Sequence, residues 1–169
     1  MYLLYGALLA LAWAAVLPYQ TVMAFLKRGA TPPFRERLGF LPAGAPSGGF
    51  WIHAVSVGEV RLALSLLPLL RERFAGAPVH LTTGTATGRA LAASGGGAPP
   101  PESISVLPFD LPFAMGRLLD RLRPRAVLIV ETEIWPNLLR LCARRGVPVL
   151  MVNGRISVRT YPRYRALGS

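Results

Sequence analysis

Two hydrophobic patterns divide the chain. Residues 1–26 form a charge-free, mostly apolar run. The remainder carries short apolar runs, each followed by a polar turn and then by apolar residues at helical spacing. Runs of this length predict strands at residues 50–55, 79–83, 104–107, 126–130 and 147–152.

Four helices are predicted between these strands. The first follows the turn 56–59 and carries leucines at helical spacing, and the others cover residues 88–93, 112–122 and 136–145. Pro112 stands at a first-turn position, where its missing N–H costs nothing, and Gly146 stops the last helix. Pro68 lies inside the first helix and is expected to kink it or split it in two.

Alternation of five strands with four helices predicts an α/β fold with a parallel, doubly wound, Rossmann-like sheet, because each helix returns the chain to start the next strand in the same direction. Ligands of such sheets bind at the carboxyl ends of the strands. The loops at this edge are residues 56–59, 82–87, 108–110, 131–133 and 153–157.

The apolar run at 1–26 is long enough to cross a hydrocarbon core of about 30 Å and predicts a membrane-anchor helix. Because Lys27, Arg28, Arg35 and Arg37 follow the run and no basic residue precedes it, the positive-inside rule places the rest of the chain in the cytoplasm. That order of charges argues against a signal peptide. Polar residues in its second half keep an interfacial or a buried helix open as alternatives.

The excess of basic residues favours an anionic partner. Nineteen Lys and Arg against eight Asp and Glu give a formal charge of +11, which suits nucleic acid, phospholipid or a phosphorylated substrate. Nucleic acid ranks last, because the aromatic residues lie mostly in the anchor and the core and are not interleaved with arginine. The single cysteine, Cys142, sits in an apolar pattern and is expected to be a packed thiol in a reducing compartment.

The chain divides into four parts by sequence. They are the anchor at 1–26, a basic linker at 27–49 that contains the motif Arg35-Glu36-Arg37-Leu38-Gly39, the α/β domain at 50–157 and a basic tail at 158–169.

Two of the predicted turns carry groups that could hold a ligand. Ser56, Gly58 and Glu59 place a hydroxyl, a flexible backbone and a carboxylate where a helix begins, which suits an anionic or polyol ligand or a plain helix cap. The hydroxyl-rich turn at 82–88 lacks the lysine of a nucleotide-binding P-loop. His53 and His80 have no partner at metal-ligand spacing, so they are expected in the core and no metal site is predicted.

Five sequence blocks have a familiar order and spacing: WIHAVSVGEV at 51–60, TTGTATG at 82–88, PFDLP at 108–112, ETEIWPNLL at 131–139 and NGRIS at 153–157. Together with the RERLG element at 35–39, they resemble the 3-deoxy-D-manno-octulosonic acid (Kdo) transferase family over essentially the whole chain. Ala86 stands where that family commonly has proline, and Gly154 where it commonly has alanine, which affects local loop geometry.

The resemblance implies a glycosyltransferase of GT-B architecture that moves Kdo from CMP-Kdo to the lipid A precursor, lipid IVA, at the cytoplasmic face of the inner membrane. In that architecture the amino-terminal domain binds the lipid acceptor, and a second domain holds most contacts to CMP-Kdo. The expected partners are therefore lipid IVA, CMP-Kdo and the membrane, with no nucleic acid and no cofactor. A chain ending at Ser169 is expected to be an amino-terminal fragment that is inactive alone.

The resemblance also implies roles for single residues. Glu36 matches the acid of the family's RERLG element and is the expected catalytic base. The residues alone favour a surface carboxylate paired with Arg35 or Arg37, and only the resemblance reverses this preference. Expected acceptor contacts are Ser56, Gly58, Glu59, Thr83, Thr85 and Arg155. Glu131 and Glu133 could bind sugar hydroxyls or hold neighbouring arginines in place, and this supporting role is the expected one. A non-catalytic, membrane-bound module remains the alternative function.

Overall fold

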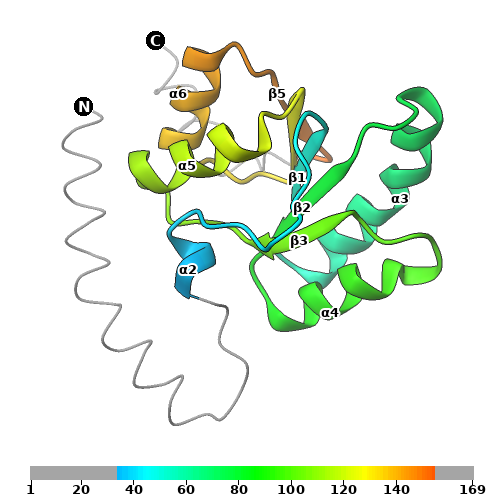
Figure 1. Cartoon of the computed structure of the whole chain (residues 1–169). Coiled ribbons are helices and arrows are strands. Elements are labelled where there is room, and N and C mark those ends of the chain that lie inside the picture. The colour runs from blue at the N-terminus through cyan, green and yellow to red at the C-terminus, as the bar shows by residue number, and fades with distance from the viewer. Residues whose placement is uncertain (1–33, 155–169) are drawn as a thin grey trace, which may run out of the picture.

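A computed structural model describes residues 34–154 (Figure 1). The predicted anchor, the tail at 158–169 and Arg155 lie outside these residues. The described elements are α2 (Phe34–Arg37), β1 (Phe50–His53), α3 (Val57–Arg73), β2 (Val79–Thr83), α4 (Ala86–Ser94), η1 (Gly95–Gly97), β3 (Ser103–Val106), α5 (Pro112–Leu122), β4 (Ala126–Val130), α6 (Pro136–Arg145) and β5 (Val149–Val152). No helix within residues 34–154 is both long and apolar enough to cross a membrane.

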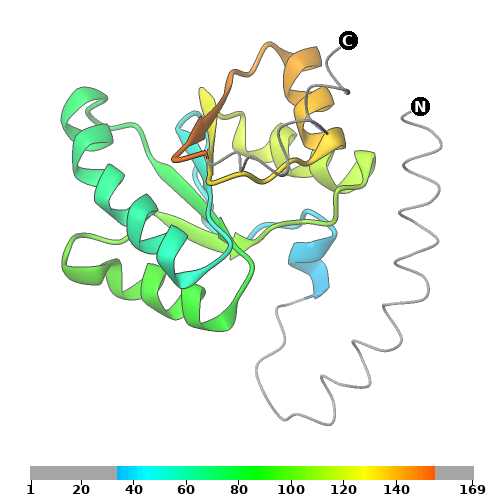
Figure 2. The same ribbon diagram turned by 180° about the vertical axis from the view of Figure 1, so that it is seen from behind.

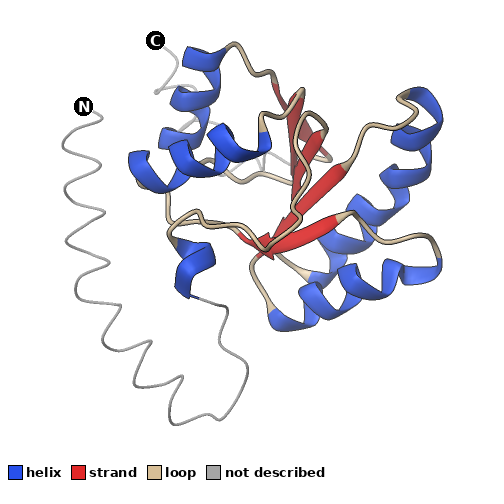
Figure 3. Cartoon of the chain, in the orientation of Figure 1, coloured by secondary structure: helices blue, strands red, loops and turns tan. Residues whose placement is uncertain are grey.

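All five strands belong to one parallel sheet in the order β3-β2-β1-β4-β5. The central strand β1 lies between β2 and β4, with Ile52 in register with Leu81 and Leu128. Helices α3 and α4 cover one face and α5 and α6 the other, as Figures 2 and 3 show from two sides. The predicted α/β class and the parallel, doubly wound sheet are confirmed.

Alternating residues of the inner strands separate two hydrophobic cores. Phe50 and Ile52 belong to the core under α3 and α4, whereas Trp51 belongs to the core under α5 and α6. Both cores are needed because a parallel strand is buried on both faces, and β1, β2 and β4 are buried at every position. Cys142 is fully buried in the second core, as predicted, and burial raises the pKa of its thiol to about 11.

The prediction that Pro68 splits its helix is wrong, because α3 runs unbroken from Val57 to Arg73. Pro68 is exposed, so its ring displaces no packed neighbour. Leu67 on one side and Leu70 on the other pack against the same core, which keeps both halves of the helix formed despite the missing N–H.

Three strands differ from the prediction at their ends: β3 is shifted by one residue, β1 ends earlier and β5 starts later. In β1 and β5, a side chain or a helix end binds the backbone groups there. Strand β1 stops at His53, since the N–H of Val55 donates to Glu59 Oε2 at 2.7 Å. Strand β5 starts at Val149, since the N–H of Val147 donates to the Cys142 carbonyl at the end of α6.

Candidate functional site

The RERLG element is docked on the carboxyl end of β3. Within the predicted linker at 27–49, Phe34–Arg37 form the short helix α2. Arg37 Nη1 donates to the Leu107 carbonyl at 3.0 Å, and its own carbonyl accepts from the Phe109 N–H at 2.9 Å. Burial lowers the pKa of Arg37, and the neighbouring Glu36 partly opposes this shift. The element thereby lies at the carboxyl edge of the sheet, where the ligands of such sheets bind.

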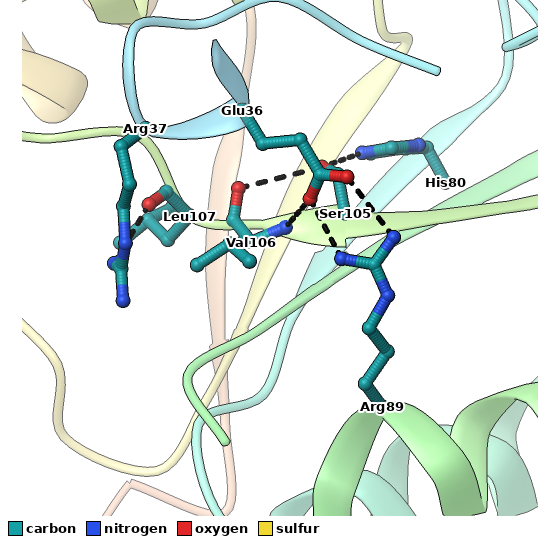
Figure 4. A network of polar contacts seen from close by, with 7 residues as sticks. All are labelled: Glu36, Arg37, His80, Arg89, Ser105, Val106 and Leu107. Carbon is teal, nitrogen blue, oxygen red and sulfur yellow. Dashed lines mark hydrogen bonds and ion pairs between the residues drawn. The ribbon is translucent and has the colours of Figure 1, made fainter. Parts of the chain in front are cut away.

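Glu36 is buried at the centre of this contact (Figure 4). Arg89 from α4 donates to both carboxylate oxygens, from Nη1 to Oε2 at 2.8 Å and from Nη2 to Oε1 at 3.0 Å. The backbone N–H of Val106 donates to Oε2 at 2.8 Å. The alternative reading as a surface carboxylate paired with Arg35 or Arg37 is therefore wrong, since the side chain is buried and its partner is Arg89.

Gly39 allows the element to approach α5. Its φ of +84° lies in the left-handed region, and a Cβ built there would stand 2.2 Å from the Ala114 carbonyl oxygen. Arg117 Nη1 donates to the Leu38 carbonyl at 2.6 Å and its guanidinium lies 4.1 Å from the centre of the Phe40 ring. These contacts close the RERLG element against the first turns of α5.

Ser56 and Glu59 form the capping box of α3. The Ser56 hydroxyl accepts from the Glu59 N–H at 3.2 Å, and Glu59 Oε1 accepts from the Ser56 N–H at 3.1 Å. Glu59 is buried, whereas Ser56 and Gly58 are exposed at the start of the helix. The cap interpretation is confirmed, and contact with an acceptor remains a prediction for these three residues.

Thr83 and Thr85 shape the turn between β2 and α4. Buried Thr83 donates its hydroxyl to the Val55 carbonyl at 3.2 Å. Exposed Thr85 caps α4 by accepting from the Gly88 N–H at 3.0 Å. Ala86 is the first helical residue, a position where the proline of the resembled family is accommodated equally well.

Glu131 and Glu133 follow β4 at the same edge. Glu131 is exposed and has a φ of +65°, an unusual backbone conformation for a residue with a side chain. Partial burial raises the pKa of Glu133, and the charges of Glu59 and Glu131 raise it further. Within residues 34–154 neither carboxylate forms an ion pair, so the expected arginine partners are not found in this range.

Asp110 is a structural residue that sequence analysis did not single out. Its buried carboxylate accepts from the N–H groups of Asn137 and Leu138, both at 2.9 Å. These are orphan donors of α6, which begins after Trp135 without a side-chain cap of its own. Asp110 stands 27 residues before Asn137 in the sequence, so local spacing gave no sign of this cap.

Three buried polar atoms near β1 and the start of α6 have no hydrogen-bond partner in the described structure: His53 Nε2, Trp135 Nε1 and Asn137 Oδ1. The His53 and Trp135 rings meet edge to face, with centroids 6.2 Å apart. Buried polar atoms without partners are rare in folded proteins, and these three belong to residues at the carboxyl edge of the sheet.

The two histidines are buried, as predicted, and no cluster of metal-binding side chains occurs among residues 34–154. Burial lowers the pKa of His53 from 6.5 to about 4, although the Thr82 carbonyl and the charge of Glu59 oppose it. Burial lowers the pKa of His80 from 6.5 to about 3. Both rings are therefore neutral in the folded protein at neutral pH.

We expect acid to destabilise the fold through these histidines. Below pH 6.5 the two histidines are protonated in the unfolded chain but stay neutral in the folded chain. Stability is therefore lost as the pH falls toward 4 for His53 and toward 3 for His80. Between pH 7 and pH 5 the free energy of unfolding, measured with urea, should fall by about 2 kcal/mol for each histidine. His80→Gln should remove about half of this pH dependence. If the free energy of unfolding changed with pH as in the wild type, His80 would not be a source of the acid sensitivity.

Comparison with known proteins places these features in a family. Residues 33–169 match the family described as 3-deoxy-D-manno-octulosonic-acid transferase (kdotransferase). The chain is 45% identical to the 3-deoxy-D-manno-octulosonic acid transferase of Bordetella pertussis over 122 residues, which cover 69% of this chain and 27% of that protein. Identity to the enzyme of the same name from Haemophilus influenzae is 35% over 144 residues, 79% of this chain and 32% of that protein. Identity to the enzyme of the same name from Chlamydia pneumoniae is 34% over 133 residues, which cover 78% of this chain and 30% of that protein. The matched regions thus span about a third or less of each of these relatives.

Proposed function

The chain belongs to the 3-deoxy-D-manno-octulosonic acid (Kdo) transferase family, and from this premise we propose that it is the acceptor-binding, amino-terminal part of a GT-B glycosyltransferase. The whole enzyme transfers Kdo from CMP-Kdo to the lipid A precursor, lipid IVA, in lipopolysaccharide synthesis. The observation that carries this proposal is the buried Glu36 carboxylate, which Arg89 and the Val106 N–H hold at the ligand-binding edge of the sheet.

Glu36 is the proposed general base. In the transfer, an acceptor hydroxyl oxygen attacks the anomeric carbon of Kdo, and the bond from that carbon to the CMP phosphate oxygen breaks. CMP leaves with the electron pair, while the proton of the hydroxyl passes to Glu36. No cofactor takes part in this scheme.

The acceptor is proposed to lie across the starts of α3 and α4. Ser56, Gly58 and Thr85 are exposed there, and the first N–H groups of a helix favour an anionic group such as a phosphate. Glu59 and Thr83 are buried beneath them and fix the two turns, and their contact with the acceptor stays part of the proposal. Arg155 is proposed to add a phosphate contact, with Glu131 and Glu133 supporting the same edge. The unpartnered atoms of His53 and Asn137 also favour a polar ligand nearby.

We further propose that the site faces the cytoplasmic surface of the inner membrane, where the acceptor is embedded. Phe34, Phe40 and Phe113 are 54%, 40% and 54% exposed and lie beside the RERLG element, in which Glu36 is buried. Arg117 lies over the rings of Phe40 and Phe113. Aromatic and basic side chains together suit the headgroup level of an anionic bilayer, and residues 1–26 would supply the anchor.

Transfer of radiolabelled Kdo from CMP-Kdo to tetraacylated lipid A precursor tests the function. We expect no turnover by residues 1–169, because the family's donor contacts lie in a second domain. A longer protein, made by expressing this chain together with the coding sequence downstream of it, should transfer Kdo; it is called the extended protein below. Turnover by residues 1–169 alone would contradict the proposal that acceptor and donor are bound by separate domains. An extended protein that folds and binds CMP-Kdo but does not transfer Kdo would contradict the proposed Kdo transfer.

The second candidate is a non-catalytic module that binds anionic lipid through the same surface, and the exposed phenylalanines with Arg117 favour it. It predicts lipid binding without transfer in both the short and the extended protein.

A further inference from the structure

Arg89 is the one residue that forms an ion pair with Glu36 among the described residues, and the two are 53 positions apart in the sequence. It comes from α4, whereas Glu36 lies on α2 and Val106 ends β3. The contact therefore ties three separate elements together at the proposed base, as Figure 4 shows.

This ion pair differs from the other two in the described part of the chain. The Glu36 side chain is 8% exposed, whereas the carboxylates of Glu102 and Asp120, which pair with Arg71 and Arg145, are 40% and 67% exposed. Exposed pairs contribute little to stability, and their removal is usually tolerated. A buried carboxylate without its partner is far less tolerated. Loss of Arg89 should therefore have a larger effect than loss of an arginine from either exposed ion pair.

The hydrogen bonds fill the two carboxylate oxygens unequally. Oε2 accepts from Arg89 Nη1 and from the Val106 N–H, which occupies both of its lone pairs. Oε1 accepts from Arg89 Nη2 alone and keeps one lone pair. The two parallel bonds from the planar guanidinium also fix the plane of the carboxylate.

From this geometry we propose that Arg89 is the positioning residue of the catalytic base: its bidentate grip orients the Glu36 carboxylate so that the remaining lone pair of Oε1 receives the acceptor proton. This inference rests on the proposed function, in which Glu36 is the base. It assigns to Arg89 no contact with the substrate. A lysine cannot reproduce the effect fully, because an ammonium group presents no planar fork to the carboxylate.

The test compares Arg89→Met and Arg89→Lys in the extended protein by the kcat and KM of Kdo transfer. We expect Arg89→Met to lower kcat by about 10 to 100-fold, since misplacement of a catalytic group by about 1 Å has effects of this size. KM for the acceptor should change less than about twofold, and Arg89→Lys should restore part of kcat. Arg71→Met, which removes a surface ion pair of the same domain, is the matched control and should keep kcat.

A double variant separates positioning from independent action. If Arg89 works only through Glu36, the pair Glu36→Gln and Arg89→Met should be no slower than Glu36→Gln alone. In residues 1–169, hydrogen exchange at the Val106 amide gives a structural readout that needs no activity, and Arg89→Met should accelerate it while Arg71→Met should not.

Each alternative result has one meaning. An unchanged kcat in Arg89→Met, with Glu36→Gln inactive, would overturn the positioning role and leave Glu36 as the base. Multiplicative losses in the double variant, or a rise in KM alone, would overturn it in favour of direct substrate contact. Full activity of Glu36→Gln would overturn the proposed base and the positioning role together. If Arg89→Met does not fold, Arg89→Lys decides, because wild-type kcat in that variant contradicts the need for a planar fork.

Discussion

Replacing Glu36 with glutamine in the extended protein is expected to lower the kcat of Kdo transfer by about 1000-fold, within the range that general bases contribute. Glutamine has nearly the same shape but cannot accept the proton of the acceptor hydroxyl. Acceptor binding should stay close to the wild-type level, because the residues proposed to contact the acceptor lie on other elements, at the starts of α3 and α4. Radiolabelled transfer and acceptor binding, measured on the same preparation, check both statements.

Glu102→Gln is the matched control, since it changes an exposed carboxylate that also pairs with an arginine, Arg71, at 2.8 Å. It should retain wild-type kcat. Retained transfer in Glu36→Gln would reject Glu36 as the base, whereas equal losses in both variants would point to a general effect of removing a carboxylate.

Gly39→Ala is expected to displace the RERLG element and to reduce transfer on the order of 100-fold, through misplacement of Glu36. The added Cβ would stand 2.2 Å from the Ala114 carbonyl oxygen, and an alanine at a φ of +84° is itself strained. The backbone must therefore move away from α5. The sheet core lies elsewhere, so the cooperative unfolding transition should persist. The extended protein is assayed for transfer, and circular dichroism follows its unfolding.

Gly44→Ala separates the two causes in this experiment. Gly44 has a similar φ of +78°, but nothing lies within 4 Å of a Cβ built there. It should show the backbone strain without the clash and should keep most of the activity. A loss of the same size in both variants would contradict the docking of Gly39 against α5 as the cause.

Local chemistry explains which elements could be predicted from sequence. The bounds of α5 and α6 agree with the prediction, because Pro112 and Pro136 fix their starts and Gly146, at a φ of +66°, ends α6. Strands β2 and β4 agree as well, since β4 is a continuous apolar run and β2 is apolar or β-branched at every position except His80.

Tertiary contacts explain what the sequence pattern missed. Pro68 breaks an isolated helix, but packing of its neighbours outweighs that local preference. The partner of Glu36 is 53 residues away, and Asp110 caps a helix 27 residues later. Spacing rules connect residues three or four positions apart, so neither contact leaves a sequence signal. The motif singled out Glu36, but its burial and its ion pair with Arg89 became visible only in the folded structure.

The most direct test of the central claim, that this chain holds the acceptor site at the carboxyl edge of its sheet, is a titration with tetraacylated lipid A precursor. Backbone amide NMR shifts of residues 1–169 are recorded in detergent micelles of fixed composition. We predict changes at residues 36–39, 56–59 and 83–85, and none at the opposite edge, where Gly49, Phe50 and His80 line a small hollow. Changes confined to that opposite edge, or no changes with lipid present in excess, would contradict the account.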